Sequence, residues 1–215
     1  MSKFNNHYIL YYIISSDIFI LKSVEFSLYL GHYFCQKIIM KHKVFISYHH
    51  EKDYDYRFKF EELFSNQLDI LDSYAVKPNE IGNVGTEEFR RIIREKHLKE
   101  STVTVVLIGE STWSRKHVDY EIYNTLTDTS NNSRSGLIGI ILPSYTSYLS
   151  KTYNSRTIPK RLIQNIQNRY SSIHFWSESP LENQKWIHDA FLRRNKILPK
   201  NSMPIMKNNW KGNSW

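Results

Sequence analysis

The chain has 215 residues, of which 40% are hydrophobic and 23% charged, so it is long enough to bury one core and too apolar to be disordered. Its one cysteine, Cys35, excludes an intramolecular disulfide framework and a cysteine-based zinc site. Residues 190–215 hold six basic residues and no acidic one, so most of the formal net charge of +8 lies there and we do not expect a nucleic acid as partner.

Residues 1–39 form a doubtful N-terminal extension. Their longest apolar run, 8–21, includes Asp17 and is shorter than the roughly 20 residues that a membrane-spanning helix needs. The segment also lacks the basic start and the small-residue cleavage site of a secretory signal. We expect a start assigned too early, with Met40 as the natural one, or a disordered leader; a weak membrane-associating leader is the alternative. The expected location is the cytoplasm.

Strands and helices alternate beyond this extension. The apolar run 44–48 predicts a buried strand that ends in a polar loop. Apolar residues at helical spacing over 60–71 predict the next helix. A weak strand over 73–76, a loop over 78–85 and a helix capped by Thr86 follow.

The second half of the chain continues the alternation. The run 102–109 is β-branched and almost wholly apolar, which is typical of a central parallel strand covered on both faces. The other predicted elements are helices over 115–126 and 158–167, strands over 137–142 and 172–176, and a last helix that begins with the capping box of Ser179, Pro180 and Glu182.

Five successive strand–helix units predict an α/β domain over residues 40–200, built on a mostly parallel five-stranded sheet with helices on both faces. Residues 201–215 have no periodicity and predict a basic, frayed tail. In such sheets ligands bind at the carboxyl ends of the strands, which directs attention to the loops that follow them.

Several common sites are absent from these loops. The sequence has no dinucleotide-binding G-x-G-x-x-G after its first strand, no phosphate-binding G-x-x-x-x-G-K-[ST] and no G-x-S-x-G nucleophile motif. A metal site at His49, His50 and Asp53 is not expected, because adjacent strand residues point to opposite faces. His117 and Glu121 have the spacing of helical metal ligands, but the sequence offers no third ligand. We therefore expect no metal.

Glu121 is the carboxylate of greatest interest. It lies three residues after Val118 and directly before Ile122, so helical geometry puts it at the margin of a packed face. A partly desolvated carboxyl group has a raised pKa and suits acid–base or electrostatic chemistry. The alternative is a solvated glutamate that pairs with Lys116 or Arg115.

Two blocks of sequence resemble a TIR domain and, more narrowly, the TIR-like ThsB family of the bacterial Thoeris anti-phage system. The first block consists of Val44, Phe45, Ser47, Tyr48, His49, Asp55 and Arg57. The second consists of residues 101–109 followed by Thr112, Trp113, Val118, Tyr120, Glu121 and Ile122. The resemblance implies a flavodoxin-like (TIR-like) fold.

The resemblance also implies an enzyme that cleaves the bond between nicotinamide and ribose in NAD+, with Glu121 as the catalytic residue. The product would be an ADP-ribose-derived nucleotide, cyclic or conjugated, that activates a separate effector. NAD+ is then substrate rather than cofactor, a phage protein is a possible trigger and a homo-oligomer is possible, whereas a membrane is not expected. Residues expected to border the substrate are Ser47, Tyr48, His49, Asp72, Ser111 and His117.

One position departs from the family. Many TIR enzymes carry Trp four residues before the glutamate, where this chain has His117. A histidine one turn from Glu121 would tune the carboxylate, contact phosphate, or weaken the activity as a surface substitution. The alternative function is therefore a catalytically silent TIR-like adaptor that acts by protein–protein assembly.

Overall fold

The computed structural model describes residues 42–65, 71–74, 98, 101–129 and 133–215. Contacts divide the chain into Met1–Ile39 and Met40–Trp215, and the description below concerns the second unit. The predictions for residues 1–39, for the loop over 78–85 and for the helix capped by Thr86 lie outside the described residues.

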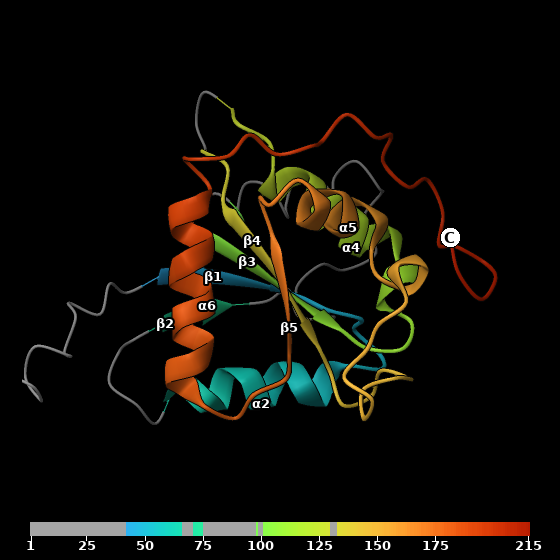
Figure 1. The fold of residues 1–215 in the computed structure, drawn as a ribbon, viewed down its shortest axis with the longest axis horizontal. Helices are drawn as coiled ribbons and strands as arrows, with labels where there is room; N and C mark the ends of the chain where they lie inside the picture. The colour runs from blue at the N-terminus through green and yellow to red at the C-terminus, as the bar shows by residue number, and fades with distance from the viewer. Residues whose placement is uncertain (1–41, 66–70, 75–97, 99–100, 130–132) are drawn as a thin grey trace, which may run out of the picture. The chain divides into compact units, whose positions relative to one another are not determined.

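A five-stranded, fully parallel sheet forms the centre of this unit, in the order β2-β1-β3-β4-β5 (Figure 1). The predicted α/β fold with a parallel sheet is confirmed. The strands are β1 (His42–Ser47), β2 (Leu71–Tyr74), β3 (Val103–Ile108), β4 (Gly136–Ile141) and β5 (Ser172–Phe175).

The described helices cover both faces of the sheet. They are α2 (Tyr54–Ser65), α4 (Lys116–Thr125), α5 (Lys160–Gln167) and α6 (Pro180–Arg193), with short 3-10 turns η2 (Thr112–Ser114) and η3 (Ser155–Thr157). Helices α2 and α6 pack on one face, and α4 and α5 on the other (Figure 1).

The strands alternate their side chains between the two resulting cores. In β3, Val105 and Leu107 pack toward α2 and α6, whereas Val106 and Ile108 pack toward α4 and α5. All six residues of β3 are buried, as its β-branched sequence predicted. This double burial identifies β3 as the centre of the domain.

The prediction for the first helix was wrong in its bounds. Helix α2 begins at Tyr54, six residues before the predicted start, and Leu71 lies in β2, paired with His42 of β1. The early turns of α2 are mostly exposed and carry little apolar pattern, so only its inward residues Phe60 and Phe64 indicated a helix. The apolar spacing then continued by chance into the next strand.

Strands β1 and β3 are neighbours whose following helices pack on opposite faces of the sheet. The chain leaves β1 for α2 and leaves β3 for α4, so the loops over 48–53 and 109–115 diverge from one another. This is the topological switch point at which parallel sheets bind ligands. The fold therefore directs the search for a site to these two loops.

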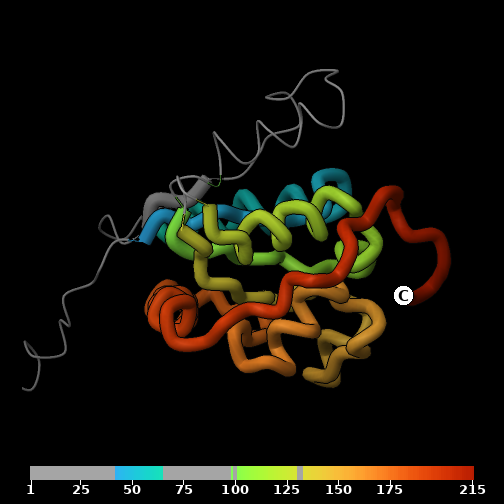
Figure 2. Tube along the Cα trace, turned by 90° about the horizontal axis from the view of Figure 1, so that it is seen from above, coloured from blue at the N-terminus to red at the C-terminus, as the bar shows by residue number. Residues whose placement is uncertain are grey.

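The C-terminal tail is attached to the domain, which corrects the prediction of a frayed end. The backbone N–H of Met206 donates to Asp119, that of Trp210 donates to the carbonyl of Ser114, and the Trp215 indole donates to the carbonyl of Ile158. Figure 2 shows this segment in red along the layer of α4 and α5. Side chains and carbonyls hold it without regular secondary structure, which is why periodicity gave no sign of it. Among the described helices, none has the length and apolar character to cross a membrane.

Candidate functional site at the ends of β1 and β3

A buried glutamate and a serine meet at the switch point. Ser47, the last residue of β1, donates its hydroxyl hydrogen to Glu121 Oε2 over 2.5 Å. Glu121 lies in the second turn of α4 and is only 1% exposed. The alternative of a solvated glutamate paired with Lys116 or Arg115 is therefore wrong.

Burial raises the pKa of Glu121 to about 8, although the hydrogen bond from Ser47 lowers it in part. A carboxyl group with such a pKa holds its proton near neutral pH and ionises when a cation approaches. This is the property expected of a group that responds to charge on a bound molecule.

His117 ties the same helix to the end of β1. Its Nε2 lies 3.1 Å from the carbonyl oxygen of Tyr48, so Nε2 carries the hydrogen and donates it. Burial, followed by the nearby His50, lowers the pKa of His117 to about 3, so its ring is neutral. Since Tyr48 occupies its donor, His117 is suited to holding α4 in place rather than to contacting phosphate.

Two other predicted site residues lie at the end of β1 and within β2. Tyr48 is fully buried in the core toward α2 and α6, with its ring 4.8 Å from that of His50, so it does not present a face for a base to stack on. Asp72 lies within β2 in register with Lys43, four residues before Ser47 along β1. It therefore lies at the level of the beginning of β1, because the strand runs on for several residues past this register.

His49 is buried and is the second residue after β1. Its Nδ1 accepts hydrogen bonds from the backbone N–H groups of Glu51 and Lys52, at 3.3 and 3.4 Å. Burial, and then the charge of Arg115, lower its pKa to about 4, so the ring is neutral with its hydrogen on Nε2.

Ser111 lies on an open cleft beside these buried groups. Lys52 bridges the two loops, with its Nζ 3.0 Å from Ser111 Oγ and 3.4 Å from a Glu110 carboxylate oxygen. The cleft has a volume of about 430 Å³, which lies within the usual range for small-molecule sites. Its lining includes Trp113 and Tyr145 but not Glu121.

Asp53 connects several loops of this region, a role that the sequence did not predict. It is buried, and its Oδ2 accepts from Thr112 Oγ1 at 2.8 Å while its Oδ1 accepts from Ser144 Oγ at 3.4 Å. A Cβ atom at position 109 would lie 2.1 Å from Asp53 Oδ1, so only Gly109 allows this approach. Asp53 thereby joins the loops after β1, β3 and β4. An acidic residue just before a helix and a glycine at a strand end were the only signals in the sequence.

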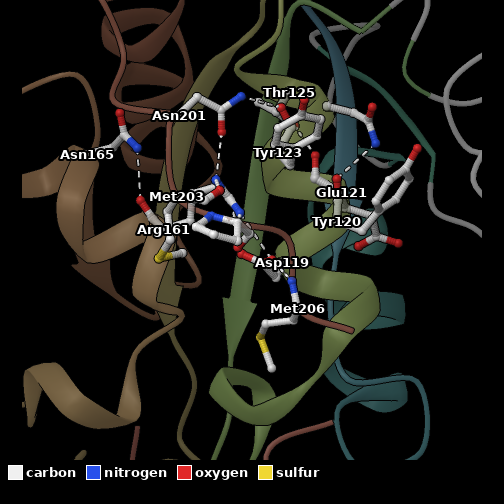
Figure 3. A network of polar contacts seen from close by, with 12 residues as sticks. Asp119, Tyr120, Glu121, Tyr123, Thr125, Arg161, Asn165, Asn201, Met203 and Met206 are labelled. Atoms are coloured by element: carbon white, nitrogen blue, oxygen red, sulfur yellow. Dashed lines mark hydrogen bonds and ion pairs between the residues drawn. The ribbon is translucent and has the colours of Figure 1, made fainter. Parts of the chain in front are cut away.

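The tail braces the helix that carries Glu121 (Figure 3). Arg161 of α5 is fully buried and binds Asp119 of α4 through two hydrogen bonds, at 3.0 and 3.2 Å. Its remaining hydrogens reach the tail, at the side chain of Asn201 and the carbonyls of Met203 and Pro204. This network links α4 to α5 and to the tail.

Within the described part of the chain, no three histidine, cysteine, aspartate or glutamate side chains gather as metal ligands would. The site consists of the Ser47–Glu121 pair, the buried His49, the half-buried His50 and His117, whose pKa values burial lowers, and an adjoining polar cleft.

Residues 45–147 match the sequence model of the TIR-like domain of the Thoeris protein ThsB. The match begins within β1 and continues through α2, β2, β3, α4 and β4, and so includes both loops of the switch point. No curated protein matches the chain. The resemblance to Thoeris ThsB expected from the two sequence blocks is confirmed.

Proposed function

We propose that this protein acts in anti-phage defence by cleaving the nicotinamide–ribose bond of NAD+. The ADP-ribose part would become a diffusible signalling nucleotide, cyclic or conjugated, that activates a separate effector in the cytoplasm. The observation that carries the proposal is the Ser47–Glu121 pair, a carboxyl group buried at the strand ends inside a segment that resembles ThsB.

The chemistry suits a buried carboxyl group. When the bond between nicotinamide and C1′ of the ribose breaks, its electron pair goes to the nicotinamide nitrogen, and positive charge moves to C1′ and the ring oxygen. The cationic nicotinamide ring favours the ionised form of Glu121, whose pKa burial has raised to about 8. The carboxylate then stabilises the oxocarbenium-like transition state.

Ser47 has a positioning part in this scheme. Its hydroxyl donates to one carboxylate oxygen of Glu121 and leaves the other oxygen for the ribose. His117 and the Asp119–Arg161 pair hold α4, so the carboxylate keeps its distance from the end of β1. A water molecule or a hydroxyl group of the nucleotide then completes the reaction at C1′.

A catalytically silent adaptor is the second candidate. Glu121 is only 1% exposed and does not line the cleft, and the family tryptophan is replaced by His117. An adaptor needs the fold and a binding surface but not an accessible carboxylate. The two candidates differ in whether NAD+ is consumed.

The decisive experiment follows nicotinamide release from NAD+ by the purified protein, with and without lysate of phage-infected cells as trigger. We expect the wild type to release nicotinamide. Glu121→Gln keeps the volume of the side chain but removes the ionisable group, and should reduce the rate of release by at least about 100-fold. Ser47→Ala should reduce this rate by about tenfold. Intact NAD+ under every trigger, together with full phage protection by Glu121→Gln, would support the adaptor instead.

A further inference from the structure

Two buried hydrogen-bond donors on the loops of the switch point have no acceptor. His49 Nε2 and Arg115 Nε are both shielded from solvent, and neither has a partner among the groups that the structure describes. A buried polar hydrogen without a partner costs on the order of 1–3 kcal/mol, so such groups commonly mark a missing ligand.

The state of His49 is fixed by its surroundings. Two backbone N–H groups donate to its Nδ1, so the neutral ring must carry its hydrogen on Nε2. His49 is 2% exposed, and Nε2 is therefore a donor that only a molecule entering the loop region can satisfy.

Arg115 brings a permanent positive charge to the same place. It is the residue that precedes α4, whereas His49 follows β1, so the two lie on the two loops of the switch point. The charge of Arg115 acts on both His49 and His117, which identifies it as their neighbour. Among the described residues, two further buried donors lack an acceptor: Arg57 Nε in the first turn of α2, and Arg194 Nε directly after α6.

These two donors lack acceptors and lie beside the guanidinium charge of Arg115 and the start of α4. Such surroundings suit a ligand with several anionic oxygens. We propose that His49 Nε2–H and Arg115 Nε–H bind the pyrophosphate of a dinucleotide whose ribose lies at Glu121. The identity of this ligand rests on the proposed function, whereas the preference for an oxyanion rests on the donors themselves.

The spacing agrees with this assignment. Ser47 and His49 are two residues apart, which is at most about 7 Å along an extended chain. In NAD+ one ribose ring and one methylene group separate C1′ from the nearer phosphate. A ribose held at the Ser47–Glu121 pair therefore brings its phosphate toward His49.

Entry of the ligand requires the two loops to separate. The Lys52–Glu110 ion pair joins them at 3.4 Å, with both side chains more than half exposed. An exposed pair of this kind is weak, and an incoming pyrophosphate competes with Glu110 for Lys52. Binding would thus open the contact and supply a third cationic group.

The test uses full-length protein carrying Glu121→Gln, which binds without turnover, and calorimetry with three probes. ADP-ribose and inorganic pyrophosphate carry the proposed group, and nicotinamide riboside lacks it. We expect His49→Ala and Arg115→Gln each to weaken the binding of ADP-ribose and of pyrophosphate by about tenfold or more. The affinity for nicotinamide riboside should stay unchanged in both variants.

Arg169→Gln is the matched control, because it removes an exposed arginine before β5, an edge strand two positions from β3 in the sheet. Thermal unfolding verifies that each variant is folded, and Arg115, which is partly exposed, provides the variant least coupled to the core. Affinities within twofold of the parent in both variants, or no binding of either anionic probe by the parent, would overturn the proposal.

The outcome is separable from that of the proposed function. If the wild type leaves NAD+ intact while pyrophosphate binding depends on His49 and Arg115, the oxyanion site stands and NAD+ cleavage fails. If NAD+ is cleaved while both variants bind ADP-ribose as the parent does, the function stands and the oxyanion site fails.

Discussion

The carboxyl group of Glu121 is titratable and almost completely shielded from solvent. Below its ordinary pKa of 4.5 the carboxyl group is protonated in the folded and the unfolded chain alike. Between pH 4.5 and about 8 the unfolded chain releases this proton while the folded protein keeps it. The folded protein therefore loses stability as the pH rises through this window.

Glu121→Gln removes this loss, because glutamine does not ionise. We expect the variant to unfold at a higher temperature than the wild type at pH 8 and at nearly the same temperature at pH 4.5. Thermal unfolding followed by circular dichroism at both pH values measures the difference. An equal fall in both proteins between pH 4.5 and pH 8 would contradict the raised pKa.

The sequence located this residue but not its environment. Helical spacing put Glu121 at the margin of a packed face, and it is instead fully enclosed with Ser47, which lies 74 residues away in the sequence. Spacing along one helix carries no information about the strand end that covers it. The same limit applies to Asp53, whose partners Thr112 and Ser144 belong to other loops.

At the scale of elements, local chemistry was the reliable guide. The capping box that begins α6 was predicted from Ser179 and Glu182, and the Ser179 hydroxyl accepts the Glu182 backbone N–H. The continuous apolar run of β3 was equally clear. The bounds of α2 and the path of the tail were not predictable, because partners distant in sequence decide them.

One buried ion pair joins α4 and α5, beside the apolar core that they share. Removing one partner of such a pair leaves the other charge buried and unpaired, so we expect Arg161→Met to reduce the free energy of unfolding by about 3–5 kcal/mol. Lys185→Met in α6 is the matched control: it breaks an exposed pair with Asp189 and should cost about 0.5 kcal/mol. Urea unfolding measures both, and equal losses would show that the buried network adds nothing.

At the scale of the whole molecule, the fold holds several histidines in their neutral form. Burial is the leading cause that lowers the pKa of His42, His49 and His174 to about 4 and that of His117 to about 3. Below pH 6.5 the unfolded chain binds protons at these positions and the folded protein does not. Stability is therefore lost as the pH falls from 6.5 toward 4.

We expect the unfolding temperature to fall steeply between pH 6.5 and pH 4.5. His174→Gln should reduce this pH dependence by the contribution of one histidine, because glutamine takes up no proton. His174 is chosen because it lies in β5, away from the switch point. Unfolding temperatures measured at half-unit steps test this. If the wild type and the variant change equally with pH, His174 is not held neutral by the fold.

The C-terminal tail contacts α4 although it follows every described strand and helix in the chain. Every strand and helix described above precedes Arg194 in the chain, yet α4 is held by hydrogen bonds to residues 201–209. During synthesis the helix bearing Glu121 thus gains its final support only after the ribosome has translated this segment. A chain that ends at Arg194 would contain the whole sheet but lack the tail contacts that hold the helix of Glu121.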